Sequence, residues 1–439
     1  MNVLFFGTGT LVPGYPVNRF LLTALRQAGA HVEECHETLW TGRLHEVYAR
    51  ARPWTLAMQA VRALPRYVQL AWRYRAAGPC DWIIVGYPGY VDVIWARLLG
   101  LRRRRPIALV AFISLYDTVV ADREQASAGS WRARLLRWVD RRAFDAADVV
   151  LVDTLAQARH YAQVFKLPRT RFQRSFVGHE FCDMMPASAG STGTGAPNQP
   201  VAEQPTAGAA SGAASGMTPP GSKVTTAGDA VGSSTTPGPL QVLFFGTYVP
   251  LHGVDVILRA AHRLREEQGV RFRLIGAGQL LTDMRRLAAQ LELKNVEFRT
   301  DWMDAAQLRR QVLAADVCLG IFGVTAKAAR VIPYKVLGAL ALARPVVSRD
   351  GPAIRELLSD GESAILCAPG DPAALAGALL RLRDDAHLAT RLAAEGHRAY
   401  VEQAAPATVG RALLRTLQEV DRERCRGSRR CDTAGSERR

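Results

Sequence analysis

The chain has 439 residues and a formal net charge of +16, and 48% of its residues are hydrophobic against 22% charged. This composition is typical of a folded globular protein and excludes a fibrous or wholly disordered chain. No window of about 18 uncharged apolar residues occurs and no basic leader precedes the first apolar run, so we expect no spanning helix, no secretory signal and a cytoplasmic location.

The first half of the chain alternates apolar runs with amphipathic segments. The first predicted helix, residues 18–29, has Asn18 as its N-cap and ends at Gly29. Further helices are expected at 53–77 and 131–144, and strands at 3–7, 31–35, 82–86, 107–112 and 149–152. This alternation predicts a parallel sheet, which binds its ligands at the carboxyl ends of the strands.

A hexapeptide, Val-Leu-Phe-Phe-Gly-Thr, occurs at residues 3–8 and again at 242–247. Each copy leads through a loop containing proline into a predicted helix, the second of which lies within 253–269. More strands are expected at 272–275, 296–298, 317–320 and 345–347. The repetition predicts two α/β domains of related plan that face each other across a cleft.

Residues 187–239 separate the two halves and consist largely of Ala, Gly, Ser, Thr and Pro. Such a segment buries too little apolar surface to offset the entropy of ordering, so we predict a disordered linker or insertion. The predicted organisation is a Rossmann-like domain at 1–186, the linker, a second Rossmann-like domain at 240–405, and a helix with a basic tail at 406–439.

Motifs of several other enzyme classes are missing from the sequence. The seven cysteines are scattered without a Cys-x-x-Cys pair, which indicates neither a disulfide framework nor a zinc site. Gly7-Thr8-Gly9 and Gly276-Ala277-Gly278 follow predicted strands but lack the third glycine of a dinucleotide fingerprint. No Asp-x-Asp triplet occurs, so we expect no bound metal and no cofactor.

Residues 319–341 hold the most informative pattern, a strand that ends in a glycine loop followed by three cations. Pro333 suits the first turn of a helix, and Lys335 would lie within that turn. Free backbone N–H groups and the helix dipole favour an anion there, and Lys327 and Arg330 add positive charge. The pattern predicts a diphosphate site; the alternative is that the three cations merely solvate a loop.

At these residues the sequence resembles the glycosyltransferases of family 4, a retaining group with the GT-B fold. The similar segments are 244–253, 274–278, 333–335, 339–347 and 355–362. The Pro-x-Lys pattern before the helix is similar to the bacterial surface-polysaccharide branch, as are residues 112–118. The resemblance implies an N-terminal acceptor domain, a C-terminal donor-nucleotide domain, and transfer of a sugar from a nucleotide-diphosphate sugar to a glycan or lipid-linked acceptor with retention of configuration.

The sequence departs from the family pattern in two features. The family places an Arg and a Lys on the diphosphate from the loop after the first strand of the second domain, where this chain has Thr247 and His252. It also carries two glutamates eight positions apart, which fall here on Arg330 and Gly338. Because glycine has no side chain to bind a ribose hydroxyl, that contact is absent or is supplied elsewhere.

The expected site residues follow from this pattern. Helix N-termini and cations can stabilise a departing diphosphate without a metal, so we predict a metal-independent hexosyl transfer. Asp117 follows a predicted strand and is our candidate for polarising the acceptor hydroxyl or steadying the sugar, the alternative being a cap or turn residue. The predicted catalytic residues are Asp117, Lys327 and Lys335; the predicted donor contacts are Gly246, Thr247, His252, Gly276, Gly278, Arg330 and Lys335; the predicted acceptor contacts are Gly7, Gly9, Tyr15, Asn18 and Arg19.

The segment 53–77 interleaves aromatic residues with arginines, and residues 1–186 hold 25 Lys and Arg against 15 Asp and Glu. Such a segment suits the interface of an anionic bilayer, which a lipid-linked acceptor would require. We therefore hypothesise peripheral membrane binding on the inner face of the cell membrane. The alternative is a surface helix with a solvated basic face.

Two other functional classes remain open. A sugar-nucleotide epimerase or a catalytically silent GT-B scaffold would share the fold, and Gly338 favours the silent form. A nucleic-acid-binding protein would suit the basic charge, but the sequence contains no known reading module, so we expect no nucleic acid as a partner.

Overall fold

A computed structural model describes residues 1–9, 16–37, 39, 53–100, 105–179, 181, 238–267 and 269–436. Tyr15 and residues 187–237 of the predicted linker lie outside these described residues. Met1–Met184 and Pro239–Arg439 belong to one compact unit, which contains both halves of the fold.

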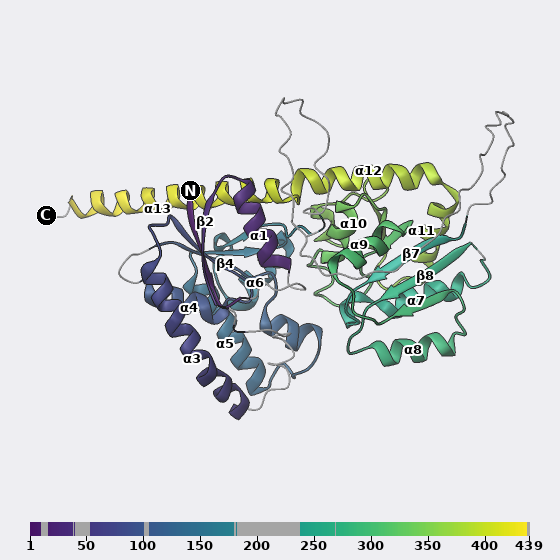
Figure 1. Cartoon of the computed structure of the whole chain (residues 1–439), viewed down its shortest axis with the longest axis horizontal. Coiled ribbons are helices and arrows are strands. Elements are labelled where there is room, and N and C mark those ends of the chain that lie inside the picture. The colour runs from purple at the N-terminus through teal and green to yellow at the C-terminus, as the bar shows by residue number, and fades with distance from the viewer. Residues whose placement is uncertain are drawn as a thin grey trace, which may run out of the picture. The chain divides into compact units, whose positions relative to one another are not determined.

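The N-terminal half is built on a six-stranded parallel sheet with the strand order β2-β1-β3-β4-β5-β6 (Figure 1). All positions of β3, β4 and β5 are buried, which explains why these strands are continuous apolar runs in the sequence. The strands are β1 Asn2–Gly7, β2 His31–His36, β3 Trp82–Val85, β4 Ile107–Val110, β5 Val149–Val152 and β6 Phe172–Arg174.

Helices cover both faces of this sheet. Successive residues of β1 point to opposite faces, and they join two separate cores: Leu4 packs with α3 to α6, whereas Val3 packs with α1 and α13. The helices are α1 Pro16–Gln27, α3 Pro53–Ala76, α4 Tyr90–Leu99, α5 Trp131–Ala146, α6 Leu155–Phe165 and, from the end of the chain, α13 Pro406–Ser436.

The C-terminal half repeats the plan with the strand order β12-β11-β10-β7-β8-β9, also fully parallel. Its strands are β7 Leu240–Phe245, β8 Val270–Ile275, β9 Val296–Arg299, β10 Val317–Leu319, β11 Val346–Arg349 and β12 Ile365–Cys367. Its helices are α7 Val254–Arg263, α8 Leu281–Gln290, α9 Ala305–Leu313, α10 Tyr334–Ala341, α11 Pro372–Asp384 and α12 Ala386–Gln403. In both sheets the order in which strands are added reverses beside the first strand of the half, between β1 and β3 and between β7 and β10. Folds of this type bind ligands at that point.

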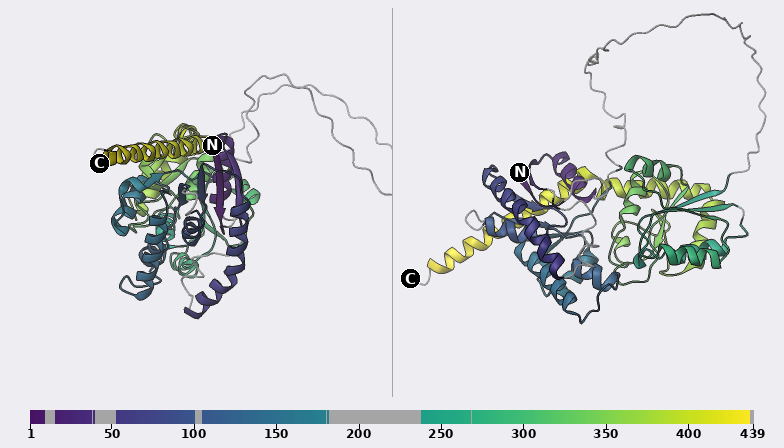
Figure 2. Two further views of the ribbon diagram at one scale, coloured as in Figure 1. Left: turned by 90° about the vertical axis from the view of Figure 1, so that its left-hand side faces the viewer. Right: turned by 60° about the horizontal axis from the view of Figure 1, so that its bottom comes forward.

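The last helix, α13, leaves the C-terminal half and packs on α1 of the N-terminal half, as Figures 1 and 2 show. Gly410 permits the close approach, since a Cβ at that position would lie 1.9 Å from the carbonyl oxygen of Ala24. We predicted residues 406–439 as a separate helix with a basic tail; Leu413 and Leu417 of this helix join the core of the N-terminal half.

The predicted fold class, two Rossmann-like domains with parallel sheets, is confirmed, and each predicted strand is present. The predicted N-cap of the first helix is wrong. Helix α1 begins at Pro16, and Asn18 lies inside it. The side-chain amide of Asn18 instead bonds the backbone of Tyr87, donating to its oxygen at 2.6 Å and accepting from its nitrogen at 2.8 Å.

Candidate donor and acceptor site

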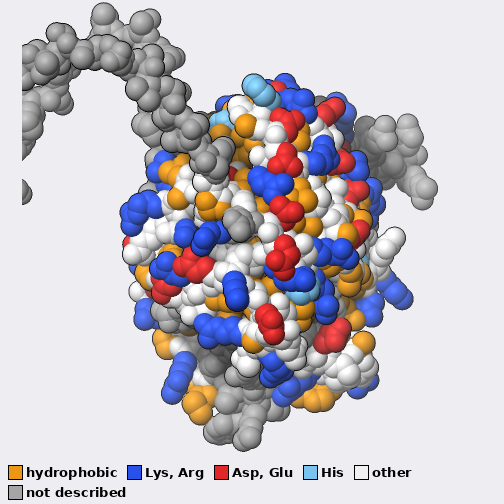
Figure 3. Space-filling model, turned by 90° about the vertical axis from the view of Figure 1, so that its right-hand side faces the viewer, with side chains coloured by type: hydrophobic (Ala, Val, Ile, Leu, Met, Phe, Trp, Pro, Cys, Tyr) orange, Lys and Arg blue, Asp and Glu red, His pale blue; other side chains and the backbone are white. Residues whose placement is uncertain are grey.

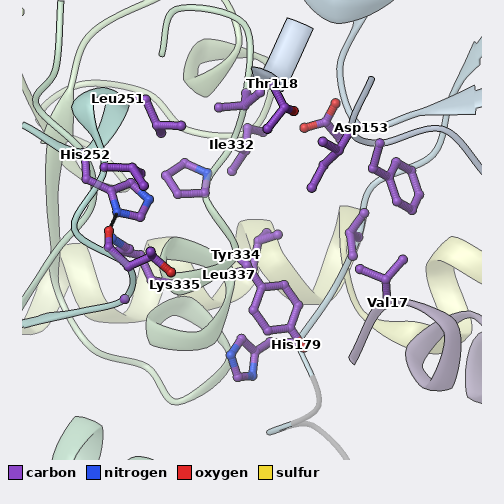
Figure 4. A pocket seen from close by; sticks show the side chains of 18 of the residues that line it. Val17, Thr118, Asp153, His179, Leu251, His252, Ile332, Tyr334, Lys335 and Leu337 are labelled. Atoms are coloured by element: carbon purple, nitrogen blue, oxygen red, sulfur yellow. Dashed lines mark hydrogen bonds between the residues drawn. The ribbon is translucent and has the colours of Figure 1, made fainter. Parts of the chain in front are cut away.

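A cavity of about 540 Å³ lies at the carboxyl ends of strands from both sheets. Loops after β4, β5 and β6 line it from the N-terminal half, and loops after β7 and β9 together with the start of α10 line it from the C-terminal half. Figure 4 shows side chains from both halves pointing into it. The acidic, basic and imidazole side chains that line it are Asp122, Arg123, Asp153, His179, His252, Asp304, Lys327 and Lys335.

Lys335 lies in the first turn of α10, as predicted, with Pro333 as the N-cap. Its side chain is 6% exposed, and its Nζ finds no hydrogen-bond partner among the described residues. The ammonium lies 3.8 Å from the ring centroid of Phe244. Burial lowers the pKa of Lys335 well below its usual range, and a bound anion would restore the charged form. The arrangement favours an anionic ligand at this position.

The loop after β7 brings backbone next to this lysine. Gly246 has a φ of +138°, and a Cβ there would lie 3.0 Å from Lys335 Nζ. Gly276 packs directly against this loop, and a Cβ at that position would lie 2.0 Å from the oxygen of Gly246. Of the predicted donor contacts, Gly246 and Thr247 line the cavity, whereas Gly276 and Gly278 pack behind it.

His252, a predicted donor contact, also lines the cavity. Its Nδ1 contacts the carbonyl oxygen of Thr247 (Figure 4). A carbonyl oxygen only accepts, so Nδ1 carries the proton and Nε2 is left as an acceptor. Burial, together with the charge of Lys335, lowers the pKa of His252 well below its usual range and keeps the ring neutral.

Lys327 lines the same cavity but is held by groups of the N-terminal half. Its Nζ donates to Thr118 Oγ1 at 2.8 Å and lies 3.9 Å from Asp117 Oδ2 and 3.7 Å from Asp122 Oδ2. Burial lowers the pKa of Lys327, and the two carboxylates partly offset that effect. The positive charge of this lysine is therefore already compensated.

Asp117 is 1% exposed and lies behind the cavity wall. Arg330 Nη2 donates to its Oδ1 at 2.8 Å, and His160 Nε2 lies 3.1 Å from the same oxygen. Burial raises the pKa of Asp117, but the His160 hydrogen bond and the charges of Lys327 and Arg330 outweigh it, so the net shift is downward. We call Asp117, Asp122, His160, Lys327 and Arg330 the Asp117 cluster.

A second set of contacts joins the halves at the start of α6. Thr154 accepts from Gln157 N at 3.0 Å as the N-cap and donates to the oxygen of Arg330. The carboxylate of Glu356 accepts from Leu155 N at 2.8 Å and from Ala156 N at 2.9 Å. An acidic side chain at a helix N-terminus stabilises the helix. These bonds add to the contacts that the Asp117 cluster makes between the two halves.

The predicted acceptor contacts that the structure describes, Gly7, Gly9, Asn18 and Arg19, do not line the cavity. Thr8, between Gly7 and Gly9, donates its N–H to Asp92 Oδ2 at 2.7 Å, which ties this loop to α4. Arg19 is exposed on α1, and Tyr15 lies outside the described residues. From this region Val17 and Tyr87 line the cavity instead.

The structure explains why glycine stands at position 338. A Cβ there would lie 2.7 Å from Cδ2 of His179, whose ring stacks on Tyr334 at 4.0 Å. The imidazole of His179, which comes from the N-terminal half, thus fills the space that a side chain at Gly338 would need. Burial lowers the pKa of His179 to about 3, so this ring is neutral.

Asp153 and Trp302 are among the cavity residues that the sequence analysis did not identify. Asp153 directly follows the buried strand β5, and Trp302, which is 80% exposed, follows β9. Both stand just beyond the carboxyl end of a predicted strand, and that position is the signal that could have identified them.

Sequence comparisons find similarity to glycosyltransferases. Residues 239–385 match the family model described as glycosyl transferases group 1. The amylovoran biosynthesis glycosyltransferase AmsK of Erwinia amylovora is 29% identical over 147 residues, which cover 33% of this chain and 36% of AmsK. The lipopolysaccharide core biosynthesis glycosyltransferase LpsE of Rhizobium meliloti is 28% identical over 176 residues, covering 40% of this chain and 49% of LpsE. The chain thus matches less than half the length of either curated relative.

Solved structures extend the similarity to both halves. Anabaena HepE, solved in complex with UDP-glucose, superposes with a TM-score of 0.59 at 13% identity over 95% of this chain and 100% of HepE. Sucrose-phosphate synthase from Thermosynechococcus elongatus gives a TM-score of 0.61 at 15% identity over 96% and 99%. At these identities the likeness concerns the fold, and it confirms the predicted GT-B architecture.

Proposed function

We propose that the chain is a glycosyltransferase that moves a hexosyl group from a nucleotide-diphosphate sugar to a glycan acceptor in surface polysaccharide biosynthesis. The observation that carries this proposal is Lys335, whose buried amino group lies in a cavity at the first turn of a helix and has no hydrogen-bond partner among the described residues. The match to glycosyl transferases group 1 supports it, because the matched region contains this lysine. UDP-glucose in the HepE structure supports a nucleotide sugar as the donor.

The proposed mechanism follows from the charge of the leaving group. When the bond between sugar and phosphate breaks, negative charge grows on the departing nucleoside diphosphate. Lys335 and the positive end of the α10 dipole stabilise that charge more strongly in the transition state than in the ground state. The chain can supply this stabilisation itself, so we propose a metal-independent transfer, and the family resemblance adds retention of configuration.

A thermal-shift screen against UDP, GDP, ADP and their sugars tests donor binding, because a ligand of the native state raises its melting temperature. Acceptor-dependent release of the nucleoside diphosphate then tests transfer. Lys335→Ala should lower turnover by about a hundredfold. Lys294→Ala removes an exposed lysine of the same half and should leave turnover unchanged. Equal turnover of Lys335→Ala and the wild-type chain would reject the proposal.

A second candidate, a sugar-nucleotide epimerase or a silent GT-B scaffold, is favoured by one observation. The imidazole of His179 occupies the space above Gly338, so no ribose-binding glutamate can stand there. An epimerase would convert the nucleotide sugar without any acceptor, and a silent scaffold would bind it unchanged. Product analysis with and without the acceptor separates these outcomes from transfer.

We also propose a lipid-linked acceptor and docking of the N-terminal half on the anionic inner face of the cell membrane. Helices α3, α4 and α5 cover the same face of the sheet, and α3 exposes Val61 and Trp72 to 71% and 70%. Helix α5 exposes Trp131 and Trp138, with arginine guanidinium groups 5.7 Å from each ring. Basic and aromatic side chains on one surface suit a bilayer interface. Figure 3 shows the contrasting face of the C-terminal half, where acidic and basic side chains are interspersed.

Flotation with vesicles of phosphatidylcholine and phosphatidylserine at low salt tests docking. None of the described helices has both the length and the apolarity to cross a bilayer, so the test concerns surface binding. The double variant Trp131→Ser/Trp138→Ser should float less than the wild-type chain. Val401→Ser, which removes an exposed apolar residue of α12, should float like the wild-type chain. Failure of the wild-type chain to float would reject the docking proposal.

A further inference from the structure

A short π-helix, η1 Asp117–Asp122, leads into the cavity wall of the N-terminal half. The N–H of Arg123, which follows it, donates to the oxygen of Thr118, five residues earlier, at 3.0 Å. Glu124 then has a φ of +52°, in the left-handed region that residues other than glycine rarely adopt. Wide turns and strained residues of this kind occur frequently at functional sites. In this chain the segment lines the cavity with Thr118, Asp122 and Arg123.

The cations that line the cavity, within the described part of the chain, are Arg123, Lys327 and Lys335. Lys327 is already compensated, because its Nζ lies 3.9 Å from Asp117 Oδ2 and 3.7 Å from Asp122 Oδ2. The histidines of the cavity are neutral, because burial lowers the pKa of each. A nucleoside diphosphate carries negative charge on both of its phosphates, which is more than the ammonium of Lys335 neutralises. Arg123 is the cation that remains for the rest of that charge.

Arg123 belongs to the N-terminal half, but its charge acts on donor residues of the C-terminal half. Burial lowers the pKa of His252, and the charges of Lys335 and Arg123 lower it further. A Cβ at Gly246 would lie 3.0 Å from Lys335 Nζ and 3.5 Å from Cε1 of His252, so the ammonium and the imidazole contact the same glycine. Figure 4 shows these two side chains and Thr118 of η1 around the cavity. Lys335 and Arg123 thus approach one imidazole from different halves.

We propose that Arg123 binds the sugar-linked phosphate of the donor from the N-terminal half, while Lys335 binds the diphosphate from the C-terminal half; this inference rests on the proposed transferase function. The planar guanidinium presents parallel N–H groups that match two phosphate oxygens, whereas an ammonium acts as a point charge. The charge of the leaving group grows on the phosphate that carried the sugar, so a second cation contributes most to the reaction there. The bound diphosphate then joins the two halves.

The test measures the affinity of each nucleoside diphosphate and of its monophosphate by titration calorimetry, in the pairs UDP and UMP, GDP and GMP, and ADP and AMP. Arg123→Gln should weaken the binding of the diphosphate by about tenfold to a hundredfold, the usual contribution of hydrogen bonds to a charged group. The affinity for the monophosphate should not change, and this binding also shows that the variant is folded. The turnover of Arg123→Gln should fall by about a hundredfold.

Two further variants sharpen the test. Arg123→Lys retains the charge beside Asp122 but lacks the planar fork, so its loss of affinity should be smaller and should still concern the diphosphate alone. Arg134→Gln removes an exposed arginine of α5 in the same half and should bind every nucleotide like the wild-type chain.

The outcomes separate this inference from the proposed function. Equal losses of affinity for the diphosphate and the monophosphate in Arg123→Gln would overturn the assignment of Arg123. Unchanged affinity for the diphosphate together with a raised KM for the acceptor would also overturn it, because Arg123 would then bind the acceptor. A wild-type chain that binds none of these nucleotides would instead reject the transferase function, and the assignment with it.

Discussion

Lys327 and Lys335 stand on the same half of the molecule, line one cavity and are each 6% exposed. Burial lowers the pKa of both. They differ in their partners: Lys327 meets Thr118, Asp117 and Asp122, whereas Lys335 meets the ring of Phe244. Equal burial therefore does not mean equal function. The paired lysine connects the two halves, and the unpaired lysine is left for a ligand.

The energetic reason is the cost of removing a charge from water. That cost amounts to several kcal/mol for each ion, and it is offset when hydrogen-bonded partners of opposite charge surround the group. For Lys327 the protein provides such partners, but for Lys335 it provides none among the described residues. An anionic ligand would offset the cost at Lys335. Substitutions at the two lysines and at their partners can therefore test the difference.

The largest effect is expected in the Asp117 cluster, where Lys327 has partners of opposite charge. Asp117→Ala leaves Lys327 and Arg330 buried with less compensation, so the free energy of unfolding should fall by about 3–5 kcal/mol. Urea denaturation measures this change. Asp283→Ala breaks an exposed ion pair with Arg286 and should cost less than about 1 kcal/mol. A loss of under 1 kcal/mol for Asp117→Ala would show that the cluster does not stabilise the fold.

The two lysines should respond oppositely to the same substitution. Lys335→Met removes a buried amino group that has no hydrogen-bond partner among the described residues, so the ligand-free protein should melt at the same or a higher temperature. Its turnover should still fall by about a hundredfold, which corresponds to about 2.7 kcal/mol. Lys327→Met leaves the carboxylates of Asp117 and Asp122 without this neighbouring cation and should lower the melting temperature. If both variants lost stability equally, the distinction between the two lysines would be wrong.

Binding of a nucleoside diphosphate should take up a proton. The pKa of Lys335 is lowered by burial in the empty cavity and would rise beside an anion, so between these two values binding adds up to about one proton. The affinity should then weaken with increasing pH by at most about 1.4 kcal/mol per pH unit. Titration calorimetry in buffers of different ionisation heat measures this uptake. It should vanish in Lys335→Met, and its absence in the wild-type chain would contradict the proposed role of Lys335.

The smallest effect is expected at Gly338, on the helix that carries Lys335. Gly338→Ala places a Cβ against the ring of His179, and this contact should lower the free energy of unfolding by about 1–3 kcal/mol. The better helix propensity of alanine should offset about 1 kcal/mol of that loss. Gly377→Ala, on α11 with no atom near the new Cβ, should show the gain alone. Thermal melting of the pair checks the difference. Equal stabilisation of both variants would mean that His179 does not restrict this position.

Much of the site was predictable because it follows from sequence patterns among neighbouring residues. Pro333 before an apolar helix places Lys335 in the first turn, and an apolar run ending in Gly246 places that glycine after a strand. The same rule applied to β5 would have found Asp153. The N-cap predicted at Asn18 was wrong because its amide is used by Tyr87, 69 residues away. A propensity for capping cannot reveal a distant partner.

The sequence by itself determined the alternation of strands and helices, the two parallel sheets and the cation at the start of α10, because apolar periodicity, glycine and proline act through neighbouring residues. Only the tertiary structure decided which cation lacks a partner, which carboxylate faces the cavity and what fills the space at Gly338. Those outcomes depend on pairs such as Lys327 with Thr118 and Arg330 with Asp117, which are 209 and 213 residues apart. The electrostatic state of a side chain is set by what surrounds it in space, and chain folding alone assembles those surroundings.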